Sequence, residues 1–169
     1  LLADERCEAS CIKNLMRSAQ ELVLSGFPEY WDDIHRFWRN HLANSQLTYT
    51  NFIKEDNSLE DTEQRTFKNI RERAKGAGFG ASMPNTVEIN RFNSISGSSS
   101  AAIPIATLMA WKATIESSKN LVLINFPVNI ETPDVKVEVG YPNAGYIRVK
   151  LNRDCRVIIR VYPWMPSPH

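Results

Sequence analysis

The chain lacks any strong excess of one charge sign. Its 169 residues carry 20 Lys and Arg against 19 Asp and Glu, a formal net charge of +1. The charges are also evenly spread, since residues 120–169 hold six basic and four acidic side chains, which leaves 14 and 15 for residues 1–119. A protein that binds a phosphate backbone normally presents a basic face. We therefore expect no nucleic-acid partner.

Cysteines and long apolar runs are also scarce. The three cysteines, Cys7, Cys11 and Cys155, cannot all pair, and their wide spacing does not indicate a disulfide framework. No apolar run approaches the roughly 20 residues that span a bilayer, and the first residues do not have the pattern of a signal peptide. We expect no membrane partner, and the compartment stays open. Hydrophobic residues (43%) and charged residues (23%) are in ordinary globular proportion.

The first two thirds of the chain show helical periodicity. Apolar residues at spacings of three and four predict a helix over about residues 4–25. Pro28 predicts the start of a second helix that continues to residue 42, antiparallel to the first because the turn between them is short. A third, shorter helix is predicted over residues 61–76, with Asp61 and Gln64 as a capping box.

A long connection separates these helices from a fourth. Residues 76–99 are rich in Gly, Ser and Asn, a composition typical of an irregular loop, and loops of this length are usually functional or mobile. The fourth predicted helix covers about residues 100–117. It is expected to bury Leu108, Trp111 and Ile115.

Strand alternation replaces the helical period after about residue 118. The four runs that show it are 121–126, 135–139, 146–151 and 156–161. Short polar turns between the later runs predict an antiparallel meander. The predicted fold class is α+β, with a helical domain over 1–118 and a β domain over 119–169. Because the chain opens within a helix without Met and ends on unfinished strands and a Pro-rich tail, we expect it to be a piece of a larger protein.

Four stretches of the sequence match a known family in order and spacing. They are residues 5–10 (ERCEAS), 28–33 (PEYWDD) with 39–42 (RNHL), 80–85 (GASMPN), and 96–111 (SGSSSAAIPIATLMAW) with the strands behind it. Together they cover most of the chain, which resembles the six-hairpin glycosidases of glycoside hydrolase family 127. The resemblance implies the C-terminal helices of an (α/α)6 toroid followed by the first strands of a β-sandwich, a fold incomplete relative to the family.

The resemblance also implies a metal site. Characterised members are retaining β-L-arabinofuranosidases in which zinc is held by a Glu-x-Cys pair and a later Cys-Cys pair, one thiolate being the nucleophile. Zinc keeps thiolates deprotonated at neutral pH, so a bound sulfur can attack the anomeric carbon. Glu5 and Cys7 match the first pair as zinc ligands, and Ser98 and Ser99 occupy the positions of the second, catalytic pair.

The two serines leave that site incomplete. A hydroxyl is a poor zinc ligand and, without an activating base, a poor nucleophile near neutral pH. The general-acid glutamate of the family precedes the Glu-x-Cys pair and falls outside this sequence. Zinc is therefore a possible cofactor whose site lacks two of four ligands, and we expect little or no hydrolysis by this chain alone.

Several reactive residues have simpler structural explanations. Cys7 and Cys11 are spaced to share a soft metal, but buried free cysteines are far commoner. His35 and His41 are six apart, so they fall on different helix faces and are most simply surface or partly buried residues. In the long connection, Glu88 is a conceivable substitute carboxylate with nothing to fix its position.

Serines and tryptophans allow two interpretations each. The run from Ser98 to Ser100 could form an anion nest at a helix start, and a helix cap by Ser100 is the simpler explanation. Tryptophans could stack on sugar rings, but three of the four (Trp31, Trp38, Trp111) lie on core stripes, and Trp164 is left open.

Three functions follow from these patterns. The first is part of a glycoside hydrolase with a sugar-sized cleft and a carbohydrate substrate. The second is a non-catalytic glycan-binding or structural module descended from that family, which would bind no zinc. The third is a self-contained helix-plus-meander interaction domain. A toroid cut in half would expose inward helix faces, so we also expect self-association through them.

Overall fold

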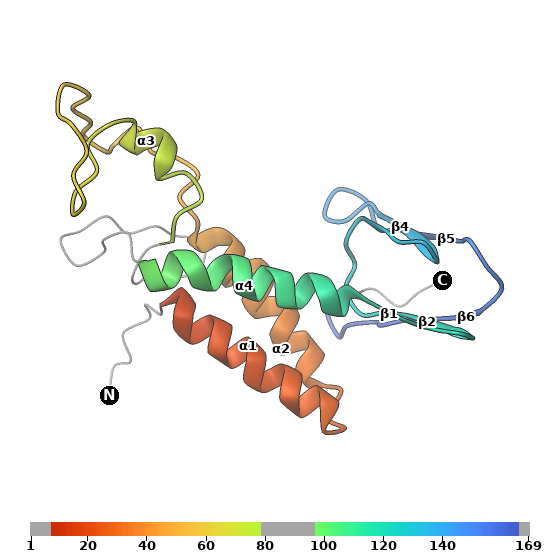
Figure 1. Cartoon of the computed structure of the whole chain (residues 1–169). Coiled ribbons are helices and arrows are strands. Elements are labelled where there is room, and N and C mark those ends of the chain that lie inside the picture. The colour runs from red at the N-terminus through yellow and green to blue at the C-terminus, as the bar shows by residue number, and fades with distance from the viewer. Residues whose placement is uncertain (1–7, 79–96, 166–169) are drawn as a thin grey trace. The chain divides into compact units, whose positions relative to one another are not determined.

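The computed structural model describes residues 8–78 and 97–165 (Figure 1). It is a mixed α+β protein with helices and two small sheets, which confirms the predicted class at that level. The chain forms two compact units, Leu1–Thr107 and Leu108–His169, and helix α4 (Gly97–Thr114) runs through the boundary. The predicted domain limit at residue 118 stays a prediction.

Two antiparallel helices open the first unit, as the short turn predicted (Figure 1). The first, α1 (Ala9–Leu24), buries an apolar stripe of Ala9, Ile12, Met16 and Ala19. In the turn that follows, Gly26 has a φ of 99°, a left-handed conformation that glycine adopts without steric cost.

The second helix begins slightly later than predicted and changes type. It starts as α2 (Tyr30–Arg36), so that Pro28 lies in the preceding turn. A π-helical segment (Phe37–Leu42) and a short 3-10 turn (Ala43–Ser45) continue it. The predicted inner face is confirmed, and its buried members are Trp31, Ile34, Trp38 and Leu42.

The predicted third helix is mostly wrong, because α3 spans Ile70–Arg73 alone. The carboxylate of Asp61 accepts hydrogen bonds from the backbone N–H groups of Phe67 (2.8 Å) and Lys68 (3.0 Å) instead of capping a helix of its own. These bonds and the ion pair with Arg73 (2.5 Å) lower the pKa of Asp61 to about 2. Acidic and amide side chains that take backbone donors offer the chain an alternative to helical bonding.

Helix α4 starts at Gly97 and turns a different face inward from the one predicted. Leu108 and Trp111 are 52% and 47% exposed, so their predicted burial is wrong. The buried side is small, and its members are Ala102, Ile103, Ala106 and Ala110. Because this helix is apolar on every side, periodicity could not select the face.

A glycine accounts for the close packing at the start of α4. A Cβ atom on Gly78 would lie 2.8 Å from the Ile103 side chain and 2.9 Å from the carbonyl carbon of Ser99. The Gly78 backbone N–H also donates to the Ser100 hydroxyl at 3.0 Å. The chain entering the long connection therefore lies directly on the first turns of α4.

The strands form two three-stranded sheets. One has the order β1 (Ile115–Ser118), β2 (Leu121–Ile124), β6 (Arg156–Ile159), and the other has the order β3 (Ile130–Glu131), β4 (Val135–Val139), β5 (Ile147–Leu151). The predicted antiparallel pairing is correct for β4 and β5, and β3, a strand that was not predicted, also pairs with β4 in the antiparallel sense. It is wrong for β6, which pairs in parallel with β2, and residues 115–118 are a strand where helix was predicted.

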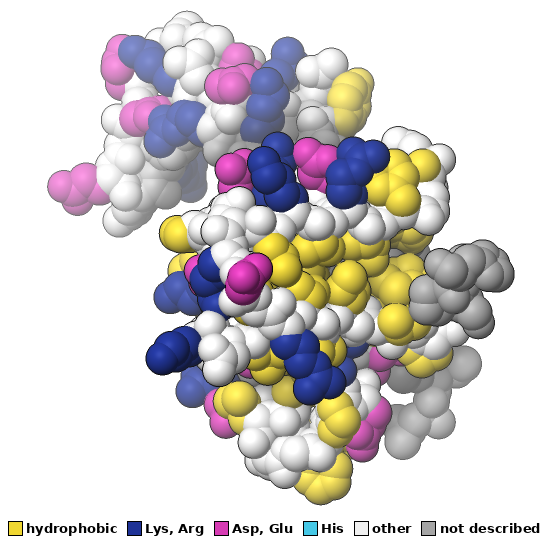
Figure 2. Space-filling view, turned by 90° about the vertical axis from the view of Figure 1, so that its right-hand side faces the viewer, with side chains coloured by type: hydrophobic (Ala, Val, Ile, Leu, Met, Phe, Trp, Pro, Cys, Tyr) yellow, Lys and Arg dark blue, Asp and Glu magenta, His cyan; other side chains and the backbone are white. Residues whose placement is uncertain are grey.

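Both sheets contribute to one apolar cluster. Its buried members come from β2, β3 and β4, namely Val122, Ile124, Ile130, Val135 and Val137. The parallel pairing of β6 follows from this packing, since it places Val157 beside Val122 at the edge of the same cluster. Apolar side chains also reach the surface of the unit, where Ile158, Ile159 and Val161 are exposed. Figure 2 shows yellow side chains gathered between charged ones on one face of the molecule.

Arg153 joins three turns of the second unit. Its guanidinium contacts Asp134 in the β3–β4 turn (2.7 Å) and the Ser117 hydroxyl at the end of β1 (3.0 Å), and it donates to the backbone carbonyls of Ser118 and Lys119. Ser117 also donates to the Asp134 carboxylate. The hydrogen bonds from Arg153 and Ser117 hold the pKa of Asp134 below its usual range.

Replacing Arg153 should destabilise the second unit. We expect Arg153→Ala to lower the unfolding temperature by several degrees, because the carbonyls and carboxylate that it joins lose a shared donor. Arg156→Ala, a change of an exposed arginine in β6, should have little effect. Equal unfolding temperatures of the two variants by circular dichroism would contradict this account.

The Asp134 contribution should also depend on pH. Its folded pKa is depressed, so its stabilisation is complete above the unfolded value of about 3.9 and is lost as the pH falls through the folded value. Asp134→Asn should therefore unfold at a lower temperature than the unmodified chain at pH 7, and the difference should shrink under strongly acidic conditions. A difference in unfolding temperature between Asp134→Asn and the unmodified chain that stays constant with pH would contradict the depressed pKa of Asp134.

In the first unit, Met16 should contribute far more stability than its neighbour. Met16 is 1% exposed and Leu15 is 47% exposed. We expect Met16→Ala to cost about 2–5 kcal/mol of unfolding free energy, because truncation of a buried side chain leaves a cavity. Leu15→Ala is the matched control on the same helix, and urea unfolding curves that show equal losses would contradict the assigned core.

Candidate functional site

The predicted zinc ligands Glu5 and Cys7 lie outside the described residues, as do Glu88 and the matched stretch 80–85. Cys11, which is described, lies exposed on α1. Within residues 8–78 and 97–165, no group of three or more His, Cys, Asp or Glu side chains could hold a metal ion. Zinc stays a prediction.

The two serines at the predicted catalytic positions occupy the first turn of α4. Ser99 is fully buried, whereas Ser98 is exposed. Consecutive residues of a helix point about 100° apart, so one faces the interior and its neighbour does not. Ser100 lies in the same turn, and its hydroxyl bonds the backbone of Gly78 rather than capping the helix, so the predicted cap is wrong.

Two histidines are buried on the second helical segment. His35 in α2 and His41 in the π-helical segment are both 6% exposed, which is more burial than a surface position would give. Burial above all, together with the positive charges of Arg39 and Arg36, lowers the pKa of His35 to about 4, although Asp32 acts in the opposite direction. His35 is therefore neutral at pH 7.

Tryptophans are mainly packing residues. The predicted burial of Trp31 and Trp38 is confirmed, and the half-exposed Trp111 is the exception. Trp164, whose burial was left open, stacks on Tyr162 with ring centroids 5.4 Å apart and an interplanar angle of 14°. Its ring also lies 5.6 Å from that of Tyr141. The aromatic surface of Trp164 is thus used within the second unit.

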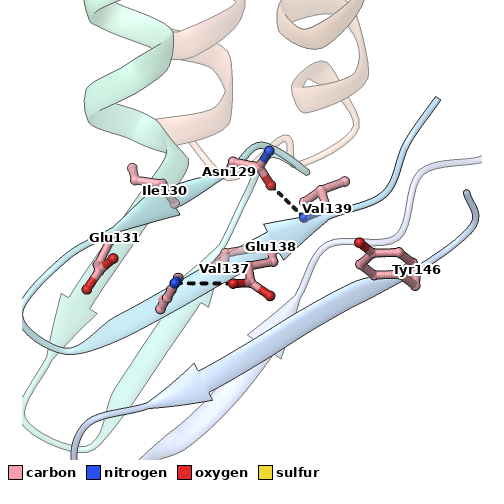
Figure 3. A pocket seen from close by; sticks show the side chains of 8 residues that line it. Asn129, Ile130, Glu131, Val137, Glu138, Val139 and Tyr146 are labelled. Carbon is pink, nitrogen blue, oxygen red and sulfur yellow. Dashed lines mark hydrogen bonds and ion pairs between the residues drawn. The ribbon is translucent and has the colours of Figure 1, made fainter. Parts of the chain in front are cut away.

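A hollow of about 510 Å³ lies on the β3-β4-β5 sheet (Figure 3). Polar and aromatic side chains from three consecutive strands and their flanking residues line it. They are Asn129, Glu131, Lys136, Glu138 and Tyr146. This volume is in the range of about 300–1,000 Å³ that is usual for small-molecule sites. The alternation of polar residues in β4 predicted a solvent-facing side of the sheet, but it did not predict a hollow there.

The carboxylate of Glu138 in the hollow is held by two cations. Glu138 contacts Arg148 at 3.0 Å and Lys136 at 3.2 Å, and the resulting hydrogen bonds keep its pKa below the usual range. Asn129 accepts a hydrogen bond from the Val139 backbone N–H at 2.7 Å, which fixes its side chain at the rim (Figure 3). The hollow therefore offers hydrogen-bond donors and acceptors with little net charge.

Comparison with known proteins does not assign a family. The chain matches no family model, no curated protein and no solved structure. Among its described helices, none has the length and apolar character needed to cross a membrane.

The depressed pKa of His35 leads to a pH dependence of stability. Because the folded state holds the imidazole neutral, its contribution is complete above the unfolded pKa of about 6.5 and is lost as the pH falls toward 4. We expect an NMR titration of the His35 Cε1 proton to give a midpoint near 4. A midpoint near 6.5 would show that the side chain is solvated and would contradict the burial of this face.

Proposed function

We propose that this chain is part of a glycoside hydrolase related to family 127. The observation that supports the proposal most is the order of elements: a helix pair, a long connection, and an apolar helix with a buried serine in its first turn, followed at once by strands. Two of the four matched stretches lie within the described residues: 28–33 with 39–42 belongs to the second helical segment, and residues 97–111 belong to α4. The substrate class is then a carbohydrate.

In this proposal α1, α2 and α4 are the last helices of an (α/α)6 toroid, and the two sheets begin a β-sandwich. The shared apolar cluster of the sheets supports the second assignment, since sandwich sheets pack by their inner faces. Exposed apolar side chains on and after α1, such as Leu15, Leu24 and Phe27, support the first, because toroid helices contact neighbours on several sides. The same side chains are the surface through which the isolated chain would self-associate.

The proposed hydrolase chemistry is limited by Ser98 and Ser99. A retaining glycosidase needs a nucleophile and an acid near the scissile bond. Ser99 brings a hydroxyl into the interior, and a serine hydroxyl is a poor nucleophile near pH 7 unless a neighbouring base activates it. We therefore propose that the chain alone does not hydrolyse glycosides.

A non-catalytic glycan-binding role is the second candidate. The hollow on the β3-β4-β5 sheet favours it, because an exposed tyrosine stands beside a set of paired polar side chains. Sugars are recognised by such combinations of an aromatic surface and hydroxyl-bonding groups. This role needs neither zinc nor a nucleophile.

Restoring the two thiols tests the family proposal. We expect the double variant Ser98→Cys/Ser99→Cys to bind one zinc ion, because Glu5, Cys7 and the new thiolates then supply four ligands. Native mass spectrometry gives the stoichiometry. Adding Cys7→Ala should abolish binding, whereas Cys11→Ala, which removes the thiol four residues later in the sequence, should leave it intact.

Two outcomes would contradict the proposal. The double variant could bind no zinc, or it could bind zinc equally well without Cys7. Either result would mean that residues 5–7 and 98–99 do not meet in one site, and the resemblance would lose its chemical basis.

A further inference from the structure

The ring of Tyr146 is seated on a glycine in the neighbouring strand segment. Gly140 donates its backbone N–H to the Tyr146 carbonyl at 3.0 Å, so the two residues face each other across the sheet. A Cβ atom on Gly140 would lie 2.5 Å from Cε1 and 2.7 Å from Cδ1 of the tyrosine ring. Any larger residue at position 140 would therefore displace the ring.

The ring is fixed and yet accessible. The Arg148 guanidinium carbon lies 5.3 Å from the ring centroid, a cation–π contact that holds the ring from the same strand. Tyr146 still exposes 48% of its surface. By comparison, the equally exposed Tyr141 is engaged with Trp164. Tyr146 is thus a pre-oriented aromatic surface, which lowers the entropic cost of binding a ligand.

Polar side chains stand next to this ring on the same side of the sheet. Residues at alternate positions of a strand share a face, so Lys136 and Glu138 of β4 lie on the side that carries Arg148 of β5 and, two residues before it, Tyr146. Glu138 and Tyr146 both line the hollow (Figure 3). Glu131 of β3 pairs with Lys136 in register. Carboxylates accept and an ammonium group donates, so the set can satisfy hydroxyl groups in both directions.

The ion pairs at Glu138 favour one class of ligand. Three cations (Lys136, Arg148 and Lys150) and two carboxylates (Glu131 and Glu138) lie on this face, and Glu138 pairs with both Lys136 and Arg148. A phosphate or a cationic ligand at Glu138 would have to break one of these pairs and leave its partner uncompensated. A neutral polyhydroxylated ring can instead stack on the tyrosine while it bonds to the paired groups.

We propose that the face around Tyr146 is a binding site for a neutral carbohydrate. The sugar ring contacts the exposed part of the Tyr146 ring, and its hydroxyl groups bond to Glu138, Lys136 and Asn129 in the hollow. The site deepens the glycan-binding proposal and uses no residue of the predicted zinc site. If this site binds no sugar, the hydrolase proposal is not affected. If the Ser98→Cys/Ser99→Cys variant binds no zinc, the proposed sugar site is not affected.

The test is an NMR titration of the chain with neutral disaccharides, namely arabinobiose, cellobiose and lactose, with glucuronic acid and inorganic phosphate as charged controls. At least one neutral sugar should shift the backbone amides of Glu138, Gly140 and Tyr146 in a saturable manner. Phosphate should not. Transferred contacts between sugar ring protons and the Tyr146 ring protons of the unmodified chain should accompany the shifts.

Three variants locate the binding surface. Tyr146→Ala should weaken binding about tenfold by removing the ring, and Gly140→Ala should cause a similar loss by displacing it. Tyr141→Ala is the matched control, because it removes a tyrosine of equal exposure from the adjoining turn, and it should leave the affinity unchanged. The unfolding temperature of each variant checks that it is folded.

Three results would overturn the inference. In the first, no neutral sugar shifts these amides in the unmodified chain. In the second, a neutral sugar binds without contacts to the Tyr146 ring or with the same affinity after Tyr146→Ala in a folded variant. In the third, phosphate or glucuronic acid shifts the same amides while neutral sugars do not, which would identify an anion site.

Discussion

The second unit depends on the hydrogen bonds of a single arginine. Arg153 reaches the end of β1, the β1–β2 turn and the β3–β4 turn, and these belong to different sheets. Without a shared cation, the two sheets would be joined mainly by their small apolar cluster. Within the β3-β4-β5 sheet, the antiparallel register of β4 and β5 continues to Gly140, whose backbone N–H donates to the Tyr146 carbonyl beside the hollow.

Much of the fold could be predicted from the sequence where the spacing of apolar residues defines a single buried face. The stripe of α1 and the buried tryptophans of the second helical segment are examples. Prediction failed where contacts between residues far apart in the sequence determine the strand partner or the buried face of a helix. The parallel pairing of β6 with β2 has no local signal, and α4 is apolar all round, so its buried alanines could not be distinguished from Leu108 and Trp111. Asp61 looked like a helix cap because its backbone partners lie six and seven residues away.

The two candidate sites differ in how far the sequence could predict them. Ser98 and Ser99 were identified through the family resemblance. They lie in the same helical turn, but Ser99 is buried and Ser98 is exposed. The Tyr146 face carries no motif, because its parts come from three strands and become a site only through register. The sequence does contain one signal of this site: Gly140 precedes the β4–β5 turn and Tyr146 follows it, so the two residues can pair across the strands.

Carbohydrate recognition is the property common to both proposed functions, with or without zinc. It requires an ordered aromatic surface with balanced polar groups, and the second unit has both. The most direct measurement is binding of the purified chain to an array of neutral and charged glycans. The account predicts binding to at least one neutral glycan. Absence of binding to every neutral glycan on the array would contradict it.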